Sequence, residues 1–145
     1  MTDTSGVLQS AGSDPLRVRL AGHDSDGELG VVEMVMGAGA VGPPLHVHPT
    51  HGEGFYVLEG ELTLQVGDRI VTGGPGTWGF APRNVPHALA NHGSADARVL
   101  CVFAPAGFER RFERMIGDGA PDEPSEAERA TRVVGPPVPR ADGEA

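Results

Sequence analysis

The sequence contains no lysine, a single cysteine and no long apolar run. Without a lysine amine, chemistry that proceeds through a Schiff base, including pyridoxal-phosphate catalysis, is excluded. Cys101 is the only cysteine, so one chain can form neither a disulfide nor a Cys-rich metal cluster, and we interpret Cys101 as a small core residue. No stretch approaches the roughly 20 apolar residues that cross a bilayer, and no charged-then-apolar leader opens the sequence. We therefore expect a soluble, cytoplasmic protein.

The charge is acidic, with 20 Asp and Glu residues against 11 basic residues and a net charge of -9. The basic residues are scattered rather than clustered, which argues against binding to nucleic acid or to an anionic membrane. The expected partner is a small molecule. A chain of 145 residues has room for one domain with one hydrophobic core, so the site lies inside that domain or between copies of it.

Short bursts of alternating apolar and polar residues indicate half-buried β-strands. Three such bursts are Leu16–Leu20, Val32–Met36 and Leu62–Val66. Turn-forming clusters separate them at the close spacing that is typical of an antiparallel sandwich or barrel, and the chain has 22 Gly and 13 Pro. The sequence therefore predicts an all-β fold.

The chain divides into three parts. Residues 1–13 are small and polar and predict a flexible arm, whereas residues 14–117 predict the β-barrel domain together with one amphipathic helix at about 107–116. Gly117 stands where that helix would end. Residues 118–145 predict a mostly disordered tail, in which Ser125–Glu128 resembles a capping box that opens one short helix.

Two stretches carry the residues with chemical potential. His46 and His48 are two apart on a predicted strand, so both imidazoles point to the same face, and a turn leads from them to Glu53 at the start of the next strand. In the second stretch, His87 opens another strand. Three imidazoles and one carboxylate form a ligand set suited to Fe, Mn, Ni, Co or Zn as a divalent ion. We therefore predict one divalent metal ion per chain, held by His46, His48, Glu53 and His87.

These stretches resemble the two motifs of the cupin superfamily. The first motif is His-x-His, four residues, Glu, six residues and Gly, and the second is Pro-x-Gly-x-x-His-x-x-x-Asn; the match runs roughly from Val31 to Phe103. The resemblance implies a jelly-roll β-barrel with the four metal ligands named above. It also places Gly60, Pro82 and Asn91 at the motifs' structural positions, and by analogy implies a homodimer.

Two positions depart from the motifs. Ala40 stands where the first motif begins with Gly, and Asn84 replaces the Gly of the second motif. Asn is the residue after Gly that best tolerates a left-handed backbone, and Gly39 and Gly42 flank Ala40, so we expect the fold to keep both turns.

The remaining histidines and aromatic residues leave alternatives open. We predict solvated surface positions for His23, His51 and His92, although His51 could also be an additional ligand or a proton shuttle at the mouth of the site. Five large side chains either line a pocket around the metal or pack in the core: Met34, Met36, Phe55, Trp78 and Phe80.

The run from Pro105 to Glu113 is similar to the end of single-domain quercetin 2,3-dioxygenase-like cupins. That resemblance implies a metal-dependent dioxygenase that acts on a small aromatic or enolic, flavonol-like or polyketide-like substrate. In this hypothesis Glu53 alternates between metal ligand and general base. The alternatives are a non-redox cyclase or isomerase that uses the metal as a Lewis acid, and a small-ligand-binding cupin without turnover.

Overall fold

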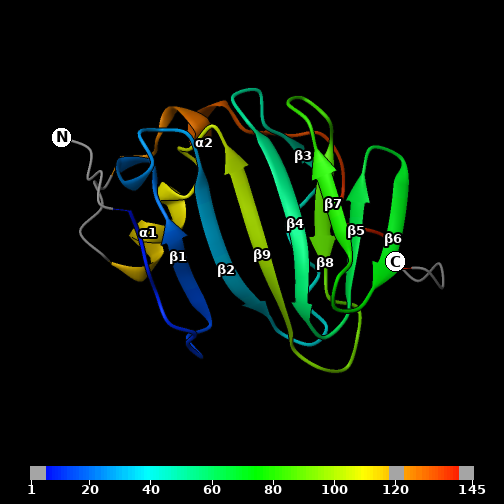
Figure 1. Cartoon of the computed structure of the whole chain (residues 1–145). Coiled ribbons are helices and arrows are strands. Elements are labelled where there is room, and N and C mark those ends of the chain that lie inside the picture. Colours follow the sequence, from blue (N-terminus) through cyan, green and yellow to red (C-terminus); the bar gives the residue numbers. More distant parts are fainter. Residues whose placement is uncertain (1–5, 118–122, 141–145) are drawn as a thin grey trace.

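The computed structural model describes residues 6–117 and 123–140 and contains two five-stranded sheets (Figure 1). All the strand pairs are antiparallel, as expected from the turn spacing in the sequence. The first sheet has the order β1 (Leu16–Leu20), β2 (Gly30–Met36), β9 (Ala97–Ala104), β4 (Gly52–Glu59) and β7 (Trp78–Ala81). The second sheet has the order β10 (Arg132–Val133), β3 (His46–Val47), β8 (His87–Ala90), β5 (Leu62–Val66) and β6 (Arg69–Gly73).

The core lies between the inner faces of the two sheets. Strand β9 shows why, because its residues alternate between buried and half-buried positions and send Val99, Cys101 and Phe103 inward. Leu62 and Leu64 of β5 join the same cluster from the other sheet. Cys101 is 1% exposed, which confirms its interpretation as a core residue.

The two departures from the cupin motifs fit their turns. Asn84 adopts a left-handed backbone with φ 66°, as predicted for the residue that replaces Gly. The backbone carbonyl of Ala40 accepts a hydrogen bond of 2.8 Å from the backbone N–H of Asn91. The Asn91 side chain is fully buried and donates to the carbonyls of Met36 and Ala95, so this residue ties the turn to β2.

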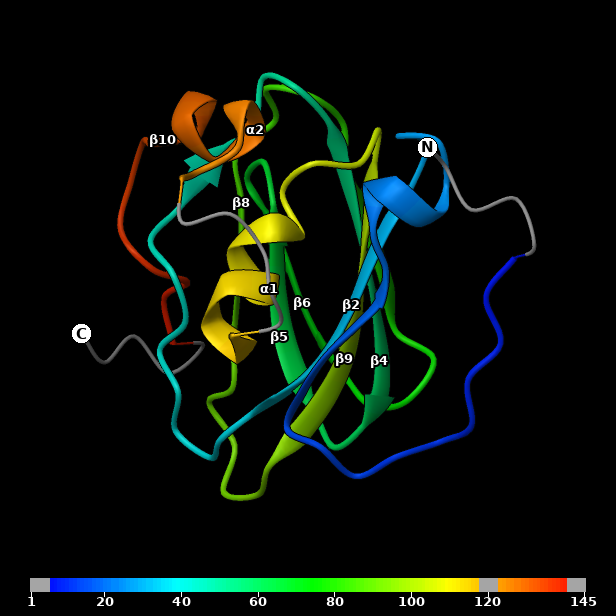
Figure 2. The same ribbon diagram turned by 90° about the vertical axis from the view of Figure 1, so that its left-hand side faces the viewer.

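The predicted helix is α1 (Arg110–Ile116), which ends at Gly117 in a left-handed conformation with φ 78°. Phe108 and Phe112 pack against the core. In Figure 2, α1 lies between the β8 side and the β2 side of the molecule. The short 3₁₀ helix η1 (Gly22–Asp24) lies between β1 and β2 in the chain. Among the described residues, no helix is long and apolar enough to span a membrane.

Residues 123–140 differ from the expectation of a mostly disordered tail, and we name this segment the C-terminal strap. It contains α2 (Glu126–Ala130), which opens with the predicted capping box of Ser125 and Glu128, and it continues into β10. Strand β10 pairs with β3, and Val138 is buried against Ala88 and Ala90. The composition concealed this order because backbone pairing depends little on side-chain type.

The other flexible parts of the expected division are only partly described. Residues 6–14 have no regular secondary structure, and the flexibility expected of the arm at residues 1–13 stays a prediction. The expectations for residues 1–5, 118–122 and 141–145 lie outside the described residues.

Trp78 and Phe80 lie on the outer surface, and neither alternative from the sequence was right for them. They are 56% and 50% exposed, because the alternation of β7 turns Gly79 and Ala81 inward instead. Their rings cover glycines of the neighbouring strand β4: a Cβ atom added to Gly54 would overlap the Trp78 ring, and one added to Gly52 would lie 2.7 Å from Phe80.

Candidate metal centre

Four side chains that the sequence predicted as metal ligands lie together between the two sheets. His46 belongs to β3, His48 follows that strand directly, Glu53 lies on β4, and His87 opens β8. One ligand atom from each residue lies within 4.8 Å of those of the other three. Register explains the convergence, because His46 and His87 are direct partners in the β3–β8 pair, and Glu53 faces them from the opposite sheet.

Each imidazole is oriented by a hydrogen bond at Nδ1. His46 Nδ1 donates to the Pro44 carbonyl over 2.8 Å, and His87 Nδ1 donates to the Val85 carbonyl over 3.0 Å. A carbonyl only accepts, so Nδ1 carries the proton in both rings and Nε2 is available as a ligand.

His48 also carries its proton on Nδ1, because of a contact with the C-terminal strap. Its Nδ1 lies 2.8 Å from Thr131 Oγ1, and the Thr131 hydroxyl donates its own proton to the Ala127 carbonyl over 2.9 Å. The hydroxyl oxygen must therefore accept from His48, which leaves Nε2 of His48 for the interior of the site.

Glu53 is the anionic centre of the cluster. Its Oε1 lies 3.1 Å from Nε2 of both His48 and His87. Burial acts to raise the pKa of Glu53, but the hydrogen bonds with these two imidazoles and their charges outweigh burial and lower the pKa to about 2. Glu53 is thus ionised at neutral pH although it is only 6% exposed.

The histidine pKa values differ within the cluster. Burial, together with the charges of His87 and His48, lowers the pKa of His46. Burial also acts to lower the pKa of His87, but its hydrogen bond with Glu53 and the carboxylate charge outweigh burial and raise that pKa. The carboxylate of Glu53 is thus the cause of the raised pKa of His87.

This arrangement fits a divalent cation. In a neutral ring with its proton on Nδ1, Nε2 carries a lone pair, which a carboxylate repels. The Nε2 atoms of His48 and His87 can therefore face Glu53 in only two ways: as the N–H of an imidazolium, or with a positive ion between them and the carboxylate. Three neutral imidazoles and one carboxylate match the preference of borderline divalent ions, and the second hydrogen bond of each ring is the usual outer support of such a ligand. The four residues could therefore hold one metal ion.

His51 is buried, and its predicted solvated position is wrong. It is 1% exposed and stacks on His48 with ring centroids 4.3 Å apart. Burial, followed by the charge of His48, lowers the pKa of His51 to about 4. The rings of Phe103 and Phe108, from distant parts of the chain, contact His51 and bury it. No local sequence pattern predicts this burial. His23 is exposed as predicted, whereas His92 is half-buried.

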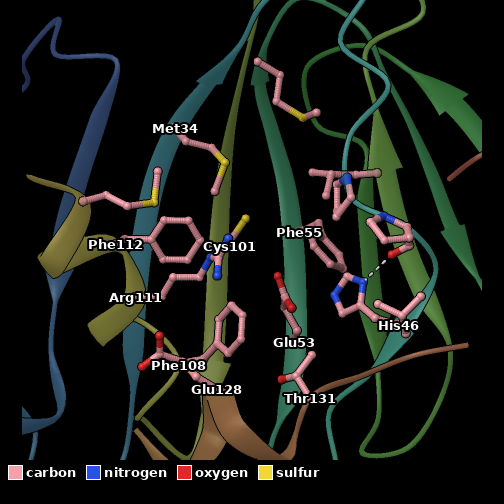
Figure 3. A pocket seen from close by; sticks show the side chains of 16 residues that line it. Met34, His46, Glu53, Phe55, Cys101, Phe108, Arg111, Phe112, Glu128 and Thr131 are labelled. Atoms are coloured by element: carbon pink, nitrogen blue, oxygen red, sulfur yellow. Dashed lines mark hydrogen bonds between the residues drawn. The ribbon is translucent and has the colours of Figure 1, made fainter. Parts of the chain in front are cut away.

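Two residues of the cluster, His46 and Glu53, line a cavity of about 420 Å³. Met34, Met36 and Phe55 line this cavity. Met36 and Phe55 also belong to the hydrophobic core and Met34 packs against it, so both of the roles left open by the sequence apply to them. Figure 3 shows Glu53 and His46 at one side of the cavity and the α1 side chains at the other. Four ionisable side chains belong to its wall besides Cys101: His46, Glu53, Arg111 and Glu128.

A family model described as a cupin domain matches residues 32–103, the range that holds the four-residue cluster. The chain belongs to the cupin superfamily. A cupin from Bacteroides fragilis shares its fold with a TM-score of 0.59 and 20% identity, over 72% of this chain and 88% of that one. An RmlC-like cupin from Shewanella frigidimarina is 30% identical with a TM-score of 0.50, over 55% of this chain and 68% of that one.

A curated relative is a quercetin 2,3-dioxygenase of Bacillus subtilis, which is 31% identical over 123 residues. The match covers 77% of this cupin and 34% of the relative. The chain therefore spans about a third of the length of that relative.

Several side chains at the site lie outside the matched family range. Arg111 comes from α1, while Glu128, Thr131 and Val133 come from the C-terminal strap. Sequence reasoning assigned none of them to the site, because their neighbours in the chain resemble an ordinary amphipathic helix and a polar tail. The capping box at Ser125 was the one local signal that this segment is ordered.

Proposed function

We propose that this cupin is a metal-dependent dioxygenase that acts on a small aromatic or enolic substrate. The observation that carries the proposal is that the cluster His46, His48, Glu53 and His87 reaches a largely apolar cavity, whose wall includes His46 and Glu53. A cavity of about 420 Å³ is within the usual size range for sites that bind small organic molecules. The relation to a quercetin 2,3-dioxygenase supports the oxidative reaction class.

The metal would supply a positive charge and an open coordination position for substrate and dioxygen. The residues of the chain would orient the substrate and move its proton. Glu53 faces the cavity, and it is the carboxylate that would accept the proton of an enolic or phenolic hydroxyl. Phe55 and Leu89 form apolar walls, which exclude water from the deprotonated substrate.

The test combines elemental analysis with oxygen uptake. The protein is purified without added metal, beside the double variant His46→Ala with His48→Ala and a matched control, His23→Ala with His92→Ala. We expect near-stoichiometric iron, nickel, cobalt or manganese in the wild-type protein and the control, and none in the ligand variant. Oxygen uptake with a flavonol should follow the metal content.

Two outcomes would contradict parts of this proposal separately. Equal metal content in the ligand variant and the wild-type protein would exclude the four-residue cluster as the metal site. Bound metal without oxygen uptake, for every candidate metal and for a panel of flavonols and related enols, would exclude the dioxygenase and leave non-redox cyclase or isomerase chemistry.

A further inference from the structure

The charges around the cavity are balanced except at one residue. Glu53 faces His48 and His87. Glu128 is paired with Arg114 and also accepts the backbone N–H of Ser125 over 2.6 Å. These contacts leave neither carboxylate of the cavity wall as a free anion.

Arg111 is the remaining charged group of the wall. Within residues 6–117 and 123–140, no carboxylate pairs with its guanidinium. Figure 3 shows the Arg111 side chain extending from α1 into the cavity, while His46 enters from the opposite side of the view. Arg111 is exposed at the cavity, so water hydrates its guanidinium and a ligand that enters the cavity can replace that water.

The surroundings of Arg111 suit a flat ligand. Phe108 and Phe112 come from the same helical segment and line the same cavity, so their rings offer apolar contact beside the guanidinium. A guanidinium binds a carboxylate through two parallel N–H donors, which fixes direction as well as charge. One wall of the cavity would then bind both the carboxylate of a ligand, at Arg111, and its apolar rings, at Phe108 and Phe112.

We propose that Arg111 binds the carboxylate of an aromatic ligand whose opposite end reaches the cluster of His46, His48, Glu53 and His87. The contact at the opposite end rests on the proposed function, whereas the contact at Arg111 does not. The ligand class is therefore an aromatic carboxylate. Arg111 is a specificity-determining residue in this assignment, because a carboxylate offers its guanidinium an anionic partner and a neutral analogue of the same shape does not.

The experiment compares two probes of nearly equal shape, 2-naphthoate and the neutral 2-naphthamide, by calorimetric titration of the full-length, metal-loaded protein. Arg111→Gln should weaken naphthoate binding by about tenfold, the usual worth of a charge-assisted pair, and leave naphthamide binding unchanged. Arg111→Lys should keep part of the naphthoate affinity, because the charge remains but the two-pronged geometry does not. Arg110→Gln is the matched control on the neighbouring helix position and should bind both probes as the wild-type protein does.

The His46→Ala, His48→Ala variant separates this proposal from the proposed function. Naphthoate binding that persists there and still depends on Arg111 supports the proposal even if no oxygen uptake is ever observed. Unchanged naphthoate affinity in Arg111→Gln would overturn it. Naphthoate binding that is lost with the histidines but insensitive to Arg111 would also overturn it, since the metal would then be the anion site.

Discussion

The hydroxyl of Thr131 lies 2.8 Å from Nδ1 of His48, although 83 positions separate the two residues in the chain. Thr131 belongs to the C-terminal strap, outside the range that matches the cupin family model. The strap thus provides the hydrogen bond that orients His48, a candidate ligand that belongs to the barrel.

Removing the Thr131 hydroxyl should weaken metal binding without unfolding the protein. Thr131→Val keeps the side-chain shape but leaves His48 Nδ1 without its acceptor, and we expect a loss in metal affinity of about tenfold. Thr131→Ser should restore most of it. The measurement is competition for zinc with a chromogenic chelator, with Thr63→Val on the distant strand β5 as the control. Equal affinity in Thr131→Val and Thr63→Val would contradict this role.

Stability should fall in acid because His51 is buried in its neutral form. Its pKa is about 4 in the folded protein against 6.5 for an unperturbed histidine. The unfolded chain therefore binds more protons between these values, and the stability contributed by neutral His51 is lost as pH falls from about 6.5 to 4. In metal-free protein, wild type should lose about 1 to 2 kcal/mol more between pH 7 and pH 5 than His51→Gln. Urea unfolding at both pH values measures this difference, and parallel losses in the two proteins would refute it.

Glu109 should contribute to the placement of α1. The carboxylate is 3% exposed and accepts the backbone N–H groups of Gly22 over 2.9 Å and Gly107 over 2.6 Å. Glu109→Ala leaves both donors without this acceptor, so we expect a loss of about 2 to 3 kcal/mol in the free energy of unfolding. Chemical denaturation of Glu109→Ala beside the exposed control Glu61→Ala provides the test. A loss no larger than that of the control would show that water replaces the carboxylate.

Gly60 ends the first cupin motif, and Gly67, which lies outside it, is a matched control for the packing at Gly60. Both have positive φ, 74° and 63°, so alanine is strained at either position. Only at Gly60 would the added Cβ meet backbone, 2.6 Å from the Asp96 carbonyl oxygen, whereas nothing lies within 4 Å at Gly67. We expect Gly67→Ala to cost about 1 kcal/mol and Gly60→Ala at least twice as much. Thermal unfolding ranks the two, and the reverse order would contradict the close packing at Gly60.

The strands and the four-residue cluster were predictable because local patterns encode them. Alternation placed β2 and β5, and His46 and His48, two positions apart on a strand, had to share a face. The burial of His51 was not predictable, since it arises from Phe103 and Phe108 far along the chain. Nor was the strap, because the β10–β3 pair is a backbone contact. The homodimer and the cytoplasmic location stay predictions.

The position of the strap has a consequence during synthesis. At about 5 to 20 residues per second, a ribosome needs roughly 4 to 17 seconds to travel the 83 positions between His48 and Thr131. The strands β1 to β9 are synthesised before the hydroxyl that orients the His48 ring. A nascent chain therefore presents all four candidate ligands before the Thr131 contact that orients one of them can form.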